Sequence, residues 1–158
     1  MRFKKIFEEQ PSEKQKEYGN YKKDHITWNG LNISIENKAG SYREGIDPDG
    51  NSWKTKMYYD YGYIKGTQGP DKDHIDVFIG PNKNSEIVFV INQKKNNGDF
   101  DEHKIILCSN TKKEAEKIYL KNYEKNWNKY FKNIQALSID EFKSWLKNGN
   151  TNKMFIRN

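Results

Sequence analysis

The sequence predicts an α+β fold in which strands come first and helices last. Residues 26–107 contain short apolar or alternating segments separated by turn-forming residues, a pattern typical of strands. Residues 111–149 instead repeat their apolar side chains at helical spacing, behind two helix-capping motifs. Strands followed by helices favour a segregated α+β domain. We expect a small OB-like antiparallel β-barrel of about five strands, followed by two C-terminal helices.

The strands are identified by their side-chain patterns and by one strong turn. Residues 31–36 alternate apolar and polar side chains, as a half-buried strand does. Residues 47–50 (DPDG) predict a turn, and we expect a hairpin that joins strands near 33–36 and 52–57. The segment 86–92 is apolar on both faces and predicts a strand buried on both sides. Further strands are expected at 58–64, 74–79 and 103–107.

Two capping boxes mark the starts of the helices. Thr111 with Glu114 begins one helix, whose apolar side chains follow at helical spacing. Ser138 with Glu141 begins the other, and Gly149 is expected to end it. The apolar faces are predicted to consist of Ala115, Ile118, Tyr119 and Tyr123 in the first helix and of Phe142, Trp145 and Leu146 in the second.

The chain is expected to divide into an arm, one domain and a tail. Residues 1–25 are charge-mixed and poor in aliphatic side chains, and Pro11 would interrupt a helix there, so we expect a flexible or partly helical arm. Residues 26–150 form the predicted domain and residues 151–158 a tail. The total of 158 residues suffices for one domain with a modest core.

Composition limits the classes of partner and compartment. The net charge of +6 favours polyanions such as phosphates or nucleic acid, although a solvated, lysine-rich surface is the simpler explanation. No apolar run approaches membrane-spanning length, so we expect no membrane partner. The single cysteine, Cys108, suits a reducing compartment, and we expect a cytoplasmic protein. Because Cys108 follows an apolar run, we expect a buried small residue rather than a nucleophile.

The densest charge cluster is acidic. Asp71, Asp73 and Asp76 lie within six residues and run into an apolar segment. Carboxylates this close repel one another unless cations or protons compensate them. Mg²⁺ takes oxygen ligands and retains several waters, so the cluster predicts a metal site suited to phosphate chemistry. A polar turn would account for Asp71 and Asp73, but not for Asp76 inside an apolar run.

Two further groups of residues could join that site. Asp101 and Glu102 follow a polar turn and precede a strand, and Lys104 beside them would bind phosphate as a point charge. A charged hairpin tip is the simpler explanation of this group taken alone. The other group consists of cations and phenols that could bind phosphate, together with one acid. Each of these residues, taken alone, is more typical of the surface or of the edge of a core. They are Glu36, Arg43, Lys54, Lys56, Tyr61, Tyr63, Tyr123 and Lys125.

The chain resembles the soluble family I inorganic pyrophosphatases. That family carries a Tyr-Gly-Tyr-Ile stretch and, after a short spacer, Asp-x-Asp-x-x-Asp-Val; these correspond to residues 61–64 and 71–77 here. Weaker similarity extends over residues 31–147. It places Glu36 at the end of an active-site strand and residues 101–104 at the family's second acidic cluster. It also matches Tyr123 to a tyrosine near the family's C-terminal helix.

The resemblance implies Mg²⁺-dependent hydrolysis of pyrophosphate to two orthophosphates. It assigns Asp73 as the base that takes a proton from a water held between metal ions. Arg43, Lys104 and Tyr123 would neutralise the leaving phosphate, and Tyr61 completes the catalytic set. The implied metal ligands are Asp71, Asp76, Asp101, Glu102 and Glu36.

Some residues depart from the family pattern and leave alternatives open. Glu124 stands where the family has lysine, and His74 replaces the usual proline. Residues 80–82 and 100–104 look more like a divergent branch found in phage and mobile-element proteins. One alternative is a metal-dependent hydrolase of a nucleotide or nucleotide signal. Another is a non-catalytic OB-like binder of single-stranded nucleic acid, which the acidic cluster disfavours. The sequence is also compatible with a homo-oligomer.

Overall fold

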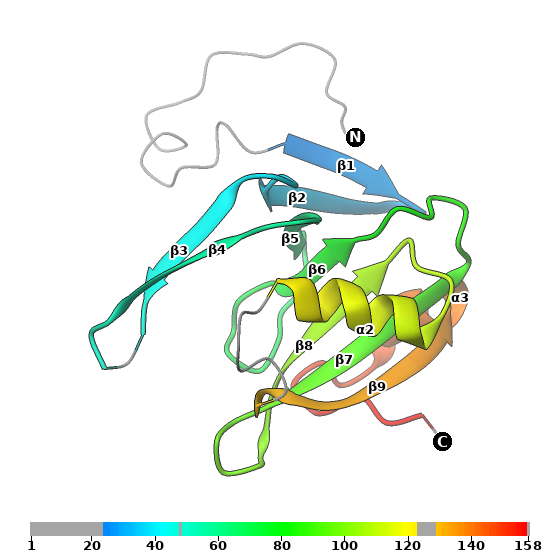
Figure 1. Cartoon of the computed structure of the whole chain (residues 1–158). Coiled ribbons are helices and arrows are strands. Elements are labelled where there is room, and N and C mark those ends of the chain that lie inside the picture. Colours follow the sequence, from blue (N-terminus) through cyan, green and yellow to red (C-terminus); the bar gives the residue numbers. More distant parts are fainter. Residues whose placement is uncertain (1–23, 48, 123–128, 158) are drawn as a thin grey trace, which may run out of the picture.

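The computed structural model describes residues 24–47, 49–122 and 129–157, and in these ranges it contains nine strands and two helices. Seven strands form one mixed sheet in the order β1-β2-β5-β6-β8-β7-β9, and β3 and β4 form a separate hairpin that projects from it (Figure 1). The strands are β1 (Asp24–Trp28), β2 (Leu31–Asn37), β3 (Tyr42–Ile46), β4 (Ser52–Lys56), β5 (Asp60–Ile64), β6 (Ile75–Ile79), β7 (Ile87–Lys94), β8 (Phe100–Leu107) and β9 (Phe131–Ser138). The helices are α2 (Lys112–Lys121) and α3 (Ile139–Asn148).

The α+β class is right, but the five-stranded antiparallel barrel does not form. The large sheet is open, with β1 and β9 as its edges, and β6 and β8 pair in parallel. The turn at 47–50 does form a hairpin, in which Asp47 Oδ1 accepts hydrogen bonds from the N–H groups of Asp49 and Asn51. It joins β3 to β4, however, and β2 pairs with β1 and β5 instead. A second reversal, with Gly40 at φ 92°, separates β2 from β3.

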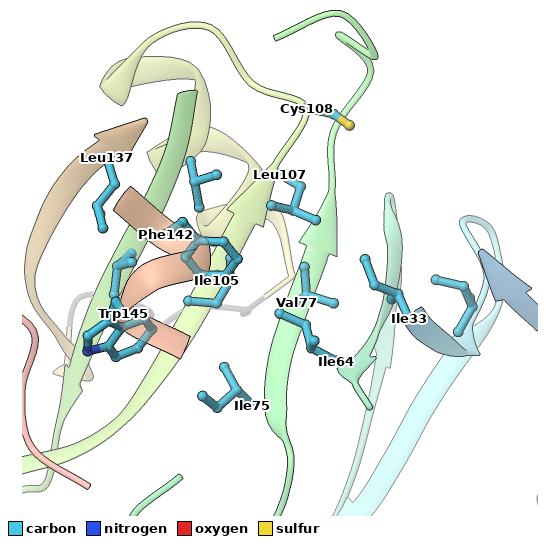
Figure 2. Packing of buried hydrophobic residues seen from close by; sticks show 13 residues of the cluster. Ile33, Ile64, Ile75, Val77, Ile105, Leu107, Cys108, Leu137, Phe142 and Trp145 are labelled. Carbon is cyan, nitrogen blue, oxygen red and sulfur yellow. The ribbon is translucent and has the colours of Figure 1, made fainter. Parts of the chain in front are cut away.

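Each face of the sheet is covered by one helix, α3 on one side and α2 on the other. One face, which we call the α3 face, packs Ile75, Val77 and Ile105 against Phe142 and Trp145 (Figure 2). The α2 face packs the intervening strand residues, such as Phe78 and Ile106, against α2. Because both faces are covered, β7 is buried on both sides, as predicted. Cys108 is buried, also as predicted.

The helix starts follow the predicted capping motifs with one difference. Ser138 and Glu141 form the full reciprocal box at α3. At α2, Thr111 Oγ1 accepts from Glu114 N–H, but the Glu114 carboxylate accepts from Asn110 N–H rather than from the cap residue. Gly149 does end α3, at a negative φ of −84°. Glycine is needed there because a Cβ would collide with Trp145.

The segment after α3 packs back onto the domain. Phe155 stacks edge-on against Trp145, with ring centroids 5.4 Å apart, and its N–H donates to Asn92 Oδ1. Thr151 Oγ1 donates to the Gln68 carbonyl, so this segment also contacts the loop before β6. No helix in the described ranges is both long enough and apolar enough to span a membrane.

Candidate active site

A pocket of about 530 Å³ is lined by a residue of the hairpin strand β3 and by residues of the large sheet, including Tyr61 on its α2 face. It gathers most of the residues that the sequence singled out, from segments far apart in the chain. The side chains lining it are Glu36, Arg43, Tyr61, Tyr63, Asp71, Asp73, His74, Asp76, Glu102 and Lys104.

Lys104 lies at the centre of the polar contacts in this pocket. Its ammonium group is 2.6 Å from Asp76 Oδ2 and 2.9 Å from Glu102 Oε1, and it donates to Tyr61 Oη at 2.9 Å. The parallel pairing of β6 with β8 sets Asp76 directly beside Lys104. The residue Lys104 is only 3% exposed, so its charge is held where water screens it weakly.

Glu102 is a partly buried carboxylate beside Lys104. Its side chain is 23% exposed, and burial raises its pKa above the ordinary value. The adjacent Lys104 charge lowers that pKa, while Asp76 and Asp71 raise it. Burial and the neighbouring carboxylates thus disfavour the ionised form of Glu102, and Lys104 favours it.

Aromatic rings hold the second cation, Arg43. Its guanidinium lies 4.7 Å from the centroid of the Tyr61 ring and 5.6 Å from that of Trp53. Trp53 lies across the hairpin from Gly45, where a Cβ would clash with the indole. Glycine at position 45 therefore lets the indole lie flat against the hairpin and back the guanidinium.

Two β-bulges occur at carboxylates that line the pocket. The pairing of β2 with β5 shifts register between Ile35 and Asn37, which leaves Glu36 as the extra residue. The pairing of β7 with β8 shifts register between Asn92 and Lys94, so that β8 has an extra residue in the stretch that contains Glu102. Bulges re-aim side chains and are frequent beside active sites. Period-two alternation alone would not reveal them.

The loop before β6 presents Asp71 and Asp73 at the pocket. Asp71 Oδ1 accepts from Asp73 N–H at 3.0 Å, and Lys72 between them has a positive φ of 68°. Thr67 anchors the end of this loop, because its Oγ1 accepts from Ile75 N–H and donates to the Ile64 carbonyl. Both carboxylates are exposed and so are accessible to a ligand.

Tyr63, one of the phenols that the sequence singled out, lines the pocket together with His74, to which the sequence assigned no role. Their rings stack with centroids 4.4 Å apart and an interplanar angle of 12°. His74 Nδ1 lies 3.2 Å from the Thr67 carbonyl oxygen. Tyr63 follows Tyr61 at the two-residue spacing that places both side chains on one face of β5.

Three predicted positions are not brought into the pocket. Asp101 does not line it, and neither Lys54 nor Lys56 does. Lys54 instead lies over the Tyr42 ring, and Lys56 over the Tyr58 ring. Tyr123 and Lys125 lie outside the described residues.

The donor chemistry of the pocket fits a hard divalent cation. Its carboxylates, Glu36, Asp71, Asp73, Asp76 and Glu102, offer oxygen ligands. Within the described ranges, no three His, Cys, Asp or Glu side chains are already grouped closely enough to hold a metal ion. Mg²⁺ needs few protein ligands because it retains several waters, so a preassembled cage is not required.

Comparison with known proteins identifies the family. The family model for inorganic pyrophosphatase matches residues 13–147. This chain belongs to the inorganic pyrophosphatase family. The match includes every residue that lines the pocket, and the resemblance carried by residues 61–64 and 71–77 is confirmed. No curated protein matches the chain.

Proposed function

We propose that this protein hydrolyses inorganic pyrophosphate to two orthophosphates with the help of Mg²⁺. The observation that carries the proposal is the convergence of five carboxylates, Arg43 and Lys104 on one pocket. A polyanionic substrate needs fixed cations, and carboxylates beside them suit divalent metal. Family membership supports a pyrophosphatase-like hydrolase.

Arg43, Lys104 and Tyr61 would bind the phosphate groups. Arg43 can grip two phosphate oxygens at once, and Tyr61 backs it through the face of its ring. Lys104 supplies a point charge, which it shares with Asp76 and Glu102. Charge that accumulates on the leaving phosphate would be neutralised by these groups, which are held in place before the substrate arrives. We also assign Tyr123 to this set, on the family resemblance.

The carboxylates divide into ligands and a base. Glu36, Asp71, Asp76 and Glu102 would hold Mg²⁺, which when bound supplies charge neutralisation and acidifies the attacking water. Asp73 would accept the proton from that water, because its carboxylate is exposed in the same pocket. Asp101 stays a proposed ligand from the resemblance alone.

Two further assignments rest on the sequence. We place the protein in the cytoplasm, because its single cysteine, Cys108, is buried and unpaired with another. We place it in the divergent phage and mobile-element branch of the family, because of residues 80–82 and 100–104.

A substrate panel tests the proposal. Phosphate release is measured with pyrophosphate, ATP and cyclic dinucleotides, each with Mg²⁺ and with EDTA. We expect Mg²⁺-dependent release that is fastest with pyrophosphate. Faster release from a nucleotide would overturn pyrophosphate as the substrate in favour of the nucleotide hydrolase. No release from any anhydride, together with salt-dependent binding of an oligonucleotide, would favour the nucleic-acid binder.

A further inference from the structure

A line of buried polar side chains runs from helix α2 to the candidate active site. Tyr119 Oη donates to Gln93 Oε1 at 2.6 Å, and Gln93 Nε2 donates to Glu102 Oε1 at 3.4 Å. The same Glu102 oxygen lies 2.9 Å from the Lys104 ammonium. Tyr119 and Gln93 are 0% and 6% exposed. Polar groups buried this deeply cost free energy unless they are paired, so the pairing is a specific feature of this core.

The Tyr119 hydroxyl and the Glu102 carboxylate together determine which end of the Gln93 amide faces the pocket. A primary amide has an acceptor oxygen at one end and a donor nitrogen at the other. Because Tyr119 donates to the oxygen, the nitrogen is directed at Glu102. The flipped amide would set its oxygen against the Glu102 carboxylate, and that contact is repulsive. The orientation of Gln93 is thus set from both ends, by Tyr119 on helix α2 and by Glu102 in the pocket.

The strand geometry places Gln93 beside the bulge that contains Glu102. Asn92 pairs with His103 and Lys94 with Phe100, so Gln93 faces two residues of β8, Asp101 and Glu102. A bulged residue lacks the regular ladder that fixes its neighbours, and its side-chain direction must be held by other contacts. Gln93 and Lys104 are the described residues that hydrogen-bond or ion-pair with the Glu102 side chain.

We propose that Tyr119 and Gln93 are positioning residues for Glu102, and through Glu102 for the Lys104 ammonium. Without the Tyr119 hydroxyl, the Gln93 amide oxygen loses its hydrogen-bond donor, and the weak hydrogen bond from Gln93 Nε2 to Glu102 is no longer held in place. Glu102 then rotates towards solvent, and Lys104 moves towards Asp76. The catalytic consequence rests on the hydrolysis proposed above, whereas the positioning itself does not.

Carbon-13 NMR of protein labelled at the glutamate side-chain carboxyl tests the positioning directly. The Glu102 resonance is assigned by its loss in Glu102→Gln. Tyr119→Phe keeps the ring that packs against Phe131 and removes only the hydroxyl. We expect this variant to shift the Glu102 resonance. The control Tyr130→Phe, which removes the hydroxyl of an exposed tyrosine, should leave it in place.

A double variant tests whether Tyr119 acts through Gln93. Gln93→Met keeps the length of the side chain without its amide. In that background Tyr119→Phe should produce no further shift of the Glu102 resonance, because the intermediate link is already broken. An unmoved Glu102 resonance in folded Tyr119→Phe would overturn the proposal. A shift of the same size in both backgrounds would also overturn it.

Turnover separates this inference from the proposed function. If the protein is a pyrophosphatase, Tyr119→Phe should lower kcat by about 10–100-fold, as loss of a partner of a metal-binding side chain does, with a smaller change in KM. An unchanged kcat together with a shifted Glu102 resonance would overturn the catalytic part and leave a structural contact. A wild-type protein that hydrolyses no anhydride would refute the proposed function, and the NMR result would still decide the positioning.

Discussion

Replacement of Lys104 by methionine removes the cation that two carboxylates share. The ammonium lies 2.6 Å from Asp76 and 2.9 Å from Glu102, and the lysine side chain is 4% exposed. Breaking a buried ion pair from one side costs about 3–5 kcal/mol, because the remaining charge is left uncompensated. The side chains of Asp76 and Glu102 are each 23% exposed, so water partly solvates the charge that is left without a partner. We therefore expect a loss of about 2–3 kcal/mol in the free energy of unfolding at pH 7.

The variant should also respond to pH in a defined direction. Burial already raises the pKa of Glu102, and removal of Lys104 takes away the largest influence that lowers it. An acid with a raised pKa in the folded state costs stability when ionised, and this cost disappears as pH falls towards the ordinary carboxyl value of 4.5. The deficit of Lys104→Met relative to wild type should therefore shrink between pH 7 and pH 5.

Urea unfolding of three proteins without added metal measures both effects. The matched control is Lys38→Met, which breaks an exposed pair with Asp24 at 2.5 Å and should cost less than about 1 kcal/mol. If Lys104→Met is no more destabilising than Lys38→Met, the ion pairs of Lys104 do not carry the stability that its burial implies. If the stability deficit of Lys104→Met instead grows as pH falls, the deficit does not come from the ionised Glu102 carboxylate.

Three other predictions concern acid, metal and backbone packing. Burial lowers the pKa of His103 from 6.5 to about 4. The free energy of unfolding should therefore fall by about 3 kcal/mol as pH decreases from 6.5 to 4. In urea titrations, His103→Leu should reduce this dependence on pH. Millimolar Mg²⁺ should raise the thermal midpoint relative to EDTA, because it would bind only the folded carboxylate site; an equal midpoint would count against a metal site. Gly62→Ala should abolish the folded state seen by circular dichroism, because the added Cβ would collide with the Ser34 carbonyl. A stably folded Gly62→Ala protein would show that β2 and β5 do not approach this closely.

Local sequence patterns predicted most individual elements but not their pairing. Apolar runs and capping residues located β5 to β8 and both helices, because each pattern reflects burial of its own segment. β9 was missed, since residues 131–138 mix polar and apolar side chains without clear alternation. Its pairing with β7, and the parallel pairing of β6 with β8, turn the expected barrel into an open sheet. Such long-range pairings leave no mark in a local window.

The gathering of candidate residues at one pocket could be predicted where these residues cluster in sequence. Asp71, Asp73 and Asp76 stood out because their mutual repulsion needs an explanation, and the structure places all three at one pocket. Asp101 shows the limit of this reasoning, because residues adjacent in a strand do not share a face, and only Glu102 of that pair lines the pocket. Gln93 gave no signal at all, since its contacts with Tyr119 and Glu102 exist only after folding.

The measurement that tests the central claim most directly is pyrophosphate turnover by wild type and Asp73→Asn under identical Mg²⁺. Asparagine keeps the shape of the side chain and cannot accept the proton from water, so turnover should fall by about 10²–10⁴-fold while the protein stays folded. Wild-type turnover that depends on Mg²⁺ and is lost in Asp73→Asn is the result that the proposal predicts. Equal phosphate release by the two proteins, or none by wild type, would contradict it.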